Sequence, residues 1–349
     1  MNVVTKKMYL RLNFFSFYLY LCYFFITFAP NFVFFCVLAR NRVYYNVAGH
    51  VFAVESSKLG LLSVMANYEP FLCPPSAASD LIFELRVAFD GLIADPQILG
   101  YNHLYTDNAE EDMPRVELYN KLSRGDQLVD EGAFGNWLIR VAKIAMAPIC
   151  CDLQCDATFT KGELHIAEDC ADIRFCIDNA LMLMYAFRTS SLMTLEMHAA
   201  VVVKGDLGYL FLGHSGTGKS THARQWLAVY EDAWLLNDDN PILRILDNGE
   251  VRVFGSPWSG KTPCYHNQSV PVKGIIKLSQ APYNKIRTLS LPEAYAYMLS
   301  SASGLKMNSK MADHMYVSIK HIITSVKMCH LECLPNVEAA KVCCGEMSE

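Results

Sequence analysis

Short apolar runs separated by turn residues dominate the chain between residues 43 and 175. Residues 43–54 are rich in β-forming side chains around a glycine turn. Residues 81–89 alternate apolar and polar side chains, with the period of two that is typical of a half-buried strand. Pro74 and Pro75 interrupt the chain between these two stretches. The pattern predicts a β-rich N-terminal domain over residues 43–175.

The pattern changes at residue 176. Residues 176–197 are apolar on most faces, which predicts a helix buried in a protein core. Asp178 and Arg188 argue against a membrane span here, because ionised side chains are costly inside a bilayer. We expect this helix to open a second domain over residues 176–349.

The second domain combines strands with helices, and some of its strands form hairpins. Strands are predicted at residues 197–203, 209–212, 233–239, 242–246, 251–254 and 270–278, and helices at residues 291–300 and 307–324. Gly205–Gly208 and Asp247–Gly249 are hairpin turn signals between neighbouring strands. We therefore predict an α+β protein in which a β-rich domain precedes a domain with a mixed, partly antiparallel sheet.

Residues 1–42 differ in composition from the rest. Residues 12–39 form two apolar runs around Pro30, long enough to suit a membrane helix. Basic residues lie on both sides of these runs, so charge does not settle an orientation. We favour a dispensable N-terminal extension on a cytoplasmic protein. The alternative is a single-span membrane anchor with the second domain in the cytoplasm.

Composition narrows the classes of function. The 349 residues are 52% hydrophobic and 19% charged, with a formal net charge of −5, so disorder is not indicated. No basic stripe suggests a nucleic-acid partner. The 13 cysteines include a cluster at Cys150, Cys151 and Cys155 that lacks a second ligand pair at zinc-site spacing. Reduced core thiols are the interpretation we favour.

The most informative motif is a glycine-rich loop between a predicted strand and a predicted helix. It consists of Gly213, His214, Ser215, Gly216, Thr217, Gly218, Lys219, Ser220 and Thr221, and it matches the full phosphate-loop pattern G-x-x-x-x-G-K-[ST]. Strand, loop and helix in this order are the context that the motif requires. The alternative is a glycine-rich turn that binds nothing.

The residue types of this loop suit ATP with Mg²⁺. The glycines let backbone N–H groups point at phosphate oxygens, and the following helix adds its positive end. Lys219 can meet the β- and γ-phosphates, and the Ser220 hydroxyl can ligate Mg²⁺.

Two acids, Asp238 and Asp239, end the next predicted strand, in a Walker-B-like position. A carboxylate there can hold Mg²⁺ directly or through water, and we assign this role to Asp239. A polar loop follows at residues 255–263 and contains Lys261. It is either a structural loop or a substrate loop in which Lys261 neutralises charge developing on the γ-phosphate.

The segment from His198 to about Lys261 resembles the HPr kinase/phosphorylase family and, more distantly, the ATP-dependent phosphoenolpyruvate carboxykinases. The resemblance rests on His198 before the loop, on the core at residues 215–219, and on the paired acids Asp238 and Asp239. Residues 43–345 as a whole look like a group of bacterial HPr-kinase-related proteins. One departure is Thr221, where HPr kinase has glutamate.

The resemblance implies a nucleotide lying across the loop of a mixed sheet. It implies that Asp238 is the base that deprotonates an acceptor hydroxyl, that Asp239 serves Mg²⁺, and that His198 lies near the phosphates. Self-association into homo-oligomers is implied by the same analogy. No segment matches the region that contacts the protein substrate of HPr kinase, so the acceptor is not implied.

The sequence therefore predicts a Mg·ATP-dependent kinase acting on a hydroxyl group of a small molecule, a peptide or a protein. Its alternative is an ATP-sensing regulatory module without turnover. Carboxykinase-like chemistry on a small acid is a weaker third hypothesis, because it needs a second cationic cluster and a transition-metal site, and the sequence offers neither.

Overall fold

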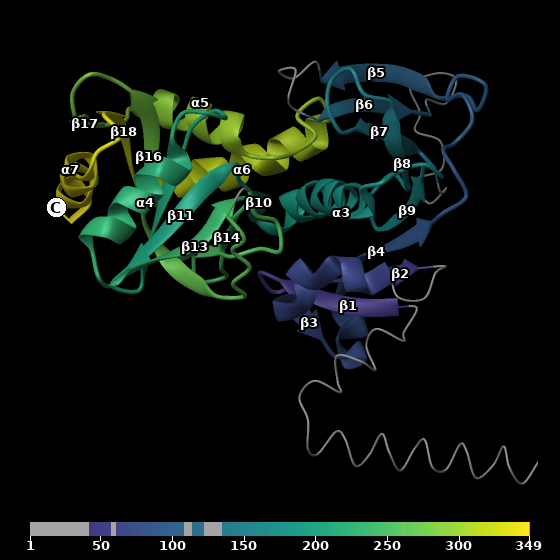
Figure 1. The fold of residues 1–349 in the computed structure, drawn as a ribbon, viewed down its shortest axis with the longest axis horizontal. Coiled ribbons are helices and arrows are strands. Elements are labelled where there is room, and N and C mark those ends of the chain that lie inside the picture. The colour runs from purple at the N-terminus through teal and green to yellow at the C-terminus, as the bar shows by residue number, and fades with distance from the viewer. Residues whose placement is uncertain (1–41, 57–60, 108–113, 122–134, 261, 349) are drawn as a thin grey trace, which may run out of the picture.

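The computed structural model describes residues 42–56, 61–107, 114–121, 135–260 and 262–348. They form a mixed α/β fold with two large mixed sheets, and the N-terminal region is rich in strands. Figure 1 shows one long helix, α3 (Ile173–Thr189), between the two sheets. The apolar stretch at residues 12–39 lies outside the described residues. Within the ranges given above, no helix is both long and apolar enough to cross a membrane.

The first sheet has nine strands in the order β3-β1-β2-β4-β9-β8-β7-β6-β5. They are β1 (Arg42–Val47), β2 (His50–Ser56), β3 (Leu72–Cys73), β4 (Leu81–Ala88), β5 (Asn102–Asp107), β6 (Arg115–Asn120), β7 (Trp137–Ala142), β8 (Ile149–Cys155) and β9 (Lys161–Ile166). The short helices η1 (Leu61–Phe71) and η2 (Pro75–Asp80) connect β2 with β3 and β3 with β4. Strand β4 runs parallel to β2 and β9, and the other pairs are antiparallel. Ala48 and Gly49 turn β1 into β2 with positive φ angles of 51° and 80°, which suits a tight hairpin.

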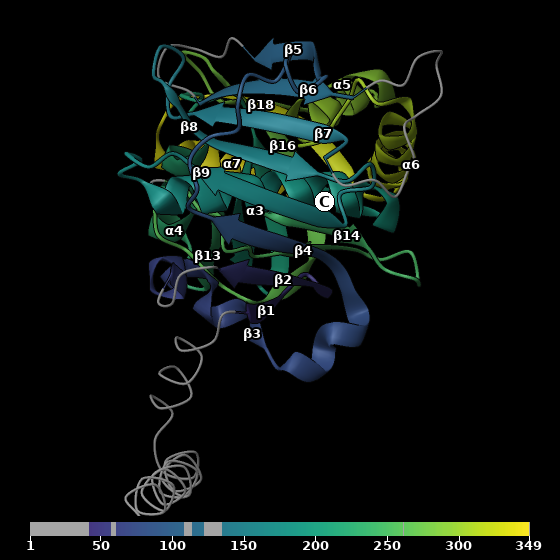
Figure 2. The ribbon, with the colours of Figure 1, turned by 90° about the vertical axis from the view of Figure 1, so that its right-hand side faces the viewer.

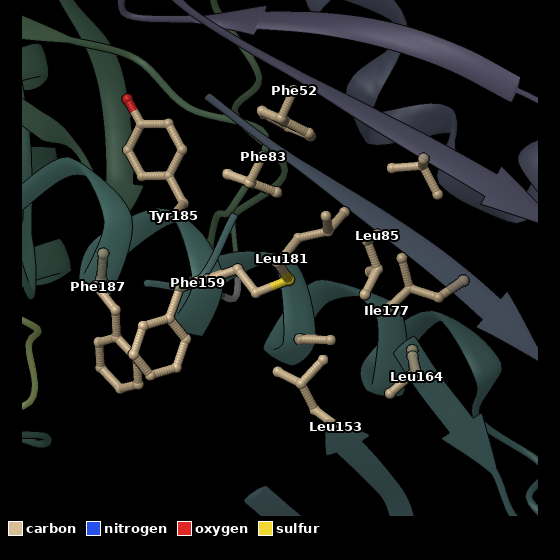
Figure 3. Packing of buried hydrophobic residues seen from close by; sticks show 14 of the residues in the cluster. Phe52, Phe83, Leu85, Leu153, Phe159, Leu164, Ile177, Leu181, Tyr185 and Phe187 are labelled. Carbon is tan, nitrogen blue, oxygen red and sulfur yellow. The ribbon is translucent and has the colours of Figure 1, made fainter. Parts of the chain in front are cut away.

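Helix α3 supplies the core of this first sheet. Asp172 caps the helix by accepting a hydrogen bond from the Phe175 N–H at 3.1 Å. One apolar face of α3 then packs against the sheet, and Figure 2 shows the strands lying across the helix. Figure 3 shows the close packing of side chains from β2, β4, β8, β9 and α3, among them Phe52, Phe83, Leu85, Leu153, Leu164, Ile177 and Leu181.

The helix predicted at residues 176–197 is shorter than expected. It ends at Thr189, and the single turn η3 (Ser190–Leu192) leads into strand β10 (Thr194–Glu196). Met193 has a positive φ of 53°, a conformation that ends a helix. The apolar pattern continues through β10 because this strand is itself buried against β14. Pattern alone therefore could not show where the helix ends.

The second sheet also has nine strands, and its main path is β10-β14-β15-β16-β12-β11-β13. Its strands after β10 are β11 (Ala199–Lys204), β12 (Leu207–Leu212), β13 (Ala233–Asp239), β14 (Ile242–Ile245), β15 (Val251–Phe254), β16 (Ser269–Gln280), β17 (Lys285–Thr288) and β18 (Lys327–Cys333). β16 is parallel to β12 and β18, whereas β11–β12 and β14–β15 are antiparallel hairpins, as predicted.

Helices cover both faces of the second sheet. α4 (Lys219–Val229) and α7 (Val337–Ser348) pack on one face, and α5 (Leu291–Ser301) and α6 (Ser309–Ser325) pack on the other. Successive residues of β11 enter opposite cores, which explains its unbroken apolar run. The cysteines in the described part of the chain are free thiols.

Strand register brings three segments to one edge of the second sheet. β11 lies between β12 and β13 and is antiparallel to both. Ala199 pairs with Leu212 on one side and with Asp239 on the other. The start of β11, the end of β12 and the end of β13 therefore meet. His198, the phosphate loop and the acidic pair lie at this edge.

A buried histidine connects the two sheets. His50 on β2 lies 2.9 Å from Thr194 Oγ1 on β10 through its Nε2 atom. The Thr194 hydroxyl donates to Leu192 O at 3.0 Å, so the histidine is the donor of the first bond. Burial, with smaller effects from Arg244 and Arg188, lowers the pKa of His50 to about 3. The ring is therefore neutral in the folded protein near neutral pH.

We expect this histidine to make stability depend on pH. Between pH 6.5 and 3 the unfolded chain binds a proton at His50 and the folded chain does not, so the free energy of unfolding falls as pH falls. The loss from pH 7 to pH 5 is about 2 kcal/mol from this group. In urea unfolding across this pH range, His50→Gln should lose that part of the slope. His314→Gln, at an exposed position, should keep it. Equal slopes for both variants would contradict the assignment.

Candidate functional site

The phosphate loop connects the buried strand β12 to α4. Gly213 is buried, His214, Ser215 and Gly216 are exposed, and α4 begins at Lys219. Gly216 and Gly218 have positive φ angles of 76° and 105°, a region that L side chains rarely adopt. A Cβ at Gly213 would lie 2.9 Å from the Thr217 side chain, so a larger residue there would force the loop to shift. The exposed backbone thus lies next to the N-terminus of a helix of 11 residues.

Lys219 is the centre of the site. It is 9% exposed, and its Nζ atom lies 2.9 Å from Gly213 O, 3.4 Å from His214 O and 2.7 Å from His198 Nε2. An ammonium group is donor-only, so His198 Nε2 accepts and the ring proton sits on Nδ1. That atom lies 3.0 Å from Asp239 Oδ1. Lys219, His198 and Asp239 therefore form one continuous chain of polar contacts.

Opposing effects act on the charge of Lys219. Burial lowers the pKa of Lys219, the charges of Asp239 and Asp238 raise it, and the charge of Lys277 lowers it again. Both acids and a second lysine are thus close enough to affect the loop lysine. The acids compensate part of the cost of burying an ammonium.

Asp238 lies beside this chain and has a different environment. It is 5% exposed, and neither carboxylate oxygen has a hydrogen-bond partner among the described residues. A buried carboxylate without a partner is costly and rare in proteins. Such a group is therefore a candidate for contact with a substrate or a metal ion.

The segment after β15 passes closely over the acids. Gly260 N donates to Asp238 O at 3.3 Å, and a Cβ at Gly260 would lie 2.8 Å from the same oxygen. Asn237 fixes the turn, since its Oδ1 accepts hydrogen bonds from the N–H groups of Asp239 and Asn240, each at 2.9 Å. Its Nδ2 donates to Trp258 O at 3.0 Å. Lys261, predicted to act in this segment, lies outside the described residues.

This segment is anchored on the N-terminal region. Trp258 Nε1 donates to the Tyr68 hydroxyl at 2.8 Å, and that hydroxyl donates to Asp178 Oδ1 at 2.7 Å. Asn67 also donates to Pro257 O at 2.9 Å. Tyr68 and Trp258 are almost fully buried. The position of the acidic pair therefore depends on residues of η1 and α3, far away in the sequence.

A cavity of 530 Å³ opens beside the phosphate loop. Thr217, Gly218 and Thr221 line one side. Gln280, the last residue of β16, and Leu334, which follows β18, line the other. Gln280 Nε2 donates to Gly216 O at 3.2 Å and so links the two sides. The volume is within the range of small-molecule sites, about 300–1,000 Å³.

Two charged residues at this edge were missed in the sequence. Lys277 on β16 pairs with Leu212 at the start of the loop, and burial lowers its pKa. Glu196 on β10 is 1% exposed, and burial, with the charge of Asp239, raises its pKa to about 8. Each is a lone charge within an apolar run. This break in the apolar pattern was the feature of the sequence that could have identified them as candidate site residues.

The donor set at the site fits Mg²⁺ in company with phosphate oxygens. Ser220 is the second residue of α4, and Asp238 and Asp239 supply carboxylate oxygens. These are hard oxygen ligands, and the unpartnered oxygens of Asp238 are consistent with a cation nearby. In the described ranges, no three His, Cys, Asp or Glu side chains form a metal-binding group. Mg²⁺ commonly uses only one or two carboxylates, with substrate phosphates and water completing its shell.

A scan of protein-family models finds no family that matches this chain, and a search of curated proteins finds no significant match. The interpretation of the site therefore depends on its own geometry.

The anchoring of the acidic turn can be tested by Trp258→Phe. The substitution removes the donor to Tyr68 and part of a buried ring, so the free energy of unfolding should fall by about 1–3 kcal/mol. Trp234→Phe, at a half-buried position on β13, is the matched control and should change stability by less. Urea unfolding monitored by circular dichroism measures both. Equal effects would mean that the contact with Tyr68 contributes no specific stability.

Proposed function

We propose that the protein binds Mg·ATP and transfers the γ-phosphoryl group to a hydroxyl acceptor. The observation that carries the proposal is that three features lie together at one edge of the second sheet. These are a complete phosphate loop, a buried lysine linked through His198 to Asp239, and the unpartnered carboxylate of Asp238. Phosphoryl transfer requires positioning and charge stabilisation more than covalent chemistry from the protein.

The loop and α4 supply the phosphate site in this proposal. The exposed N–H groups at residues 214–216 and the N-terminus of α4 hold phosphate oxygens. Lys219 exchanges one of its present acceptors for a phosphate oxygen. The cavity beside Gln280 takes the nucleoside, because it adjoins the loop on the side away from the acids.

Asp238 and Asp239 have different roles in the proposed reaction. Asp238 takes the proton of the acceptor hydroxyl as the new O–P bond forms and the bond between the γ-phosphorus and the bridging oxygen breaks, with its electrons going to ADP. Asp239 orients His198 and, with Ser220, would hold Mg²⁺. The metal would supply positive charge to the phosphate oxygens.

An antiparallel strand, β11, separates the phosphate-loop strand from the acid strand and presents His198 between them. This arrangement supports the HPr kinase/carboxykinase type of phosphate-loop domain within the proposal. Lys277 adds a second cation beside Lys219. The acceptor belongs to the class of hydroxyl compounds.

Lys219→Met tests nucleotide binding. Losing one charged hydrogen-bonding group should weaken Mg·ATP binding by about 10- to 100-fold. Lys285→Met, an exposed lysine on β17, should bind like the unchanged protein. Titration calorimetry measures both, and thermal unfolding checks that both variants fold. Unchanged affinity in Lys219→Met would refute the phosphate site.

Asp238→Asn tests the chemical step. With ATP labelled at the γ-phosphate and cell extract as the source of acceptor, the unchanged protein should label an acceptor. Asp238→Asn should reduce the rate by about 10²- to 10⁴-fold while ATP affinity stays within a few-fold. Asp247→Asn, in the exposed β14–β15 turn, is the control. Undiminished transfer would disprove the base, and ATP binding without any transfer would favour an ATP-sensing module.

A further inference from the structure

A second cavity, of 620 Å³, lies where the first sheet meets the second. Strands β6 and β7 line one side, α3 lines another, and the segment at residues 303–307 after α5 closes a third. The wall is mainly apolar, with contributions from Val116, Leu118, Ile139 and Leu183. None of the residues assigned to phosphate binding lines it.

One acidic side chain interrupts this apolar wall. Glu196 on β10 lines the cavity and is 1% exposed. Its Oε2 atom has no hydrogen-bond partner in the described part of the chain. The only other charged lining residue is Lys306, which is exposed at the rim, although partial burial of its ammonium group lowers its pKa.

The structure around Glu196 holds the residue firmly in place. Glu196 pairs with Ile242 in the antiparallel ladder of β10 and β14, and its carbonyl accepts a hydrogen bond from Ser303 N at 2.9 Å. The backbone therefore fixes a carboxyl group at the cavity wall. A buried carboxyl oxygen without a partner, here Oε2, costs free energy that a hydrogen-bonding cation in the cavity would recover.

The local charge favours a cation over a neutral donor. The pKa of Glu196 is raised to about 8, mainly by burial and further by the negative charge of Asp239, so the carboxyl group is mostly protonated near neutral pH until a cation binds beside it. Asp239 therefore adds negative potential at the carboxyl group. An ammonium group placed there interacts favourably with both acids, whereas a hydroxyl group gains only a hydrogen bond.

We propose that this cavity binds a small, mainly apolar molecule that carries one primary amine. On binding, Glu196 releases its proton to solvent and the ammonium group contacts the resulting carboxylate, while the apolar body packs between α3 and strands β6 and β7. The site is separate from the phosphate site and does not depend on phosphoryl transfer. Glu196, the proposed contact of this ligand, precedes His198 by two residues. The ligand would therefore lie next to the sheet edge that carries the proposed nucleotide site.

The proposal is tested with phenylbutylamine and phenylbutanol, which match in shape and differ in the charged group. Binding to the full-length protein is measured by titration calorimetry without nucleotide. The amine should bind at least about tenfold more tightly than the alcohol. Glu196→Gln keeps the shape of the side chain and should weaken amine binding about tenfold, while alcohol binding stays within twofold.

A second variant fills the cavity. Leu183→Trp adds volume on the α3 wall and should weaken binding of both probes, while thermal unfolding and Mg·ATP affinity stay close to those of the unchanged protein. If Glu196→Gln fails to fold, the amine–alcohol comparison and Leu183→Trp still decide the question. Equal binding of the two probes, amine binding that survives either substitution, or no binding of the amine would overturn the proposal.

Discussion

The burial of Lys219 is the constraint on which the rest of the site depends. A buried ammonium group must have hydrogen-bond acceptors and nearby negative charge. The loop carbonyls of Gly213 and His214 provide part of this, and His198 backed by Asp239 provides the rest. These partners come from the ends of β12 and β13 and from the residue before β11. The antiparallel placement of β11 is what brings all of them to one edge.

The N-terminal sheet and its connecting segments also help to position the residues of the site. Trp258 follows the β14–β15 hairpin, which comes after the acidic pair, and it donates a hydrogen bond to Tyr68, which in turn donates one to Asp178 on α3. His50 makes a second buried contact with β10, the strand that carries Glu196. The two sheets are thus joined by polar contacts inside an apolar junction. A substitution in the first sheet can therefore shift the positions of Asp238 and Asp239 through these contacts.

Local structure could be predicted from the sequence where a pattern is typical of only one kind of element. The β1–β2, β11–β12 and β14–β15 hairpins, and the strand–loop–helix order around residues 213–221, were all predictable from turn residues and apolar runs. The end of α3 was not, because β10 is buried on both faces and continues the same apolar pattern. Lys277 and Glu196 were passed over for a related reason, since a lone charge in a strand has meaning only once its neighbours are known.

The sequence by itself determined the phosphate-loop motif, the two acids after β13 and the alternation of strands that builds two sheets. Each of those features depends only on residues that are close together along the chain. Only the tertiary structure decided that His198 lies between Lys219 and Asp239, that Asp238 is buried without a partner, and that Glu196 faces an apolar cavity. The physical reason is that burial and pairing depend on strand order and register, which join residues from distant parts of the chain.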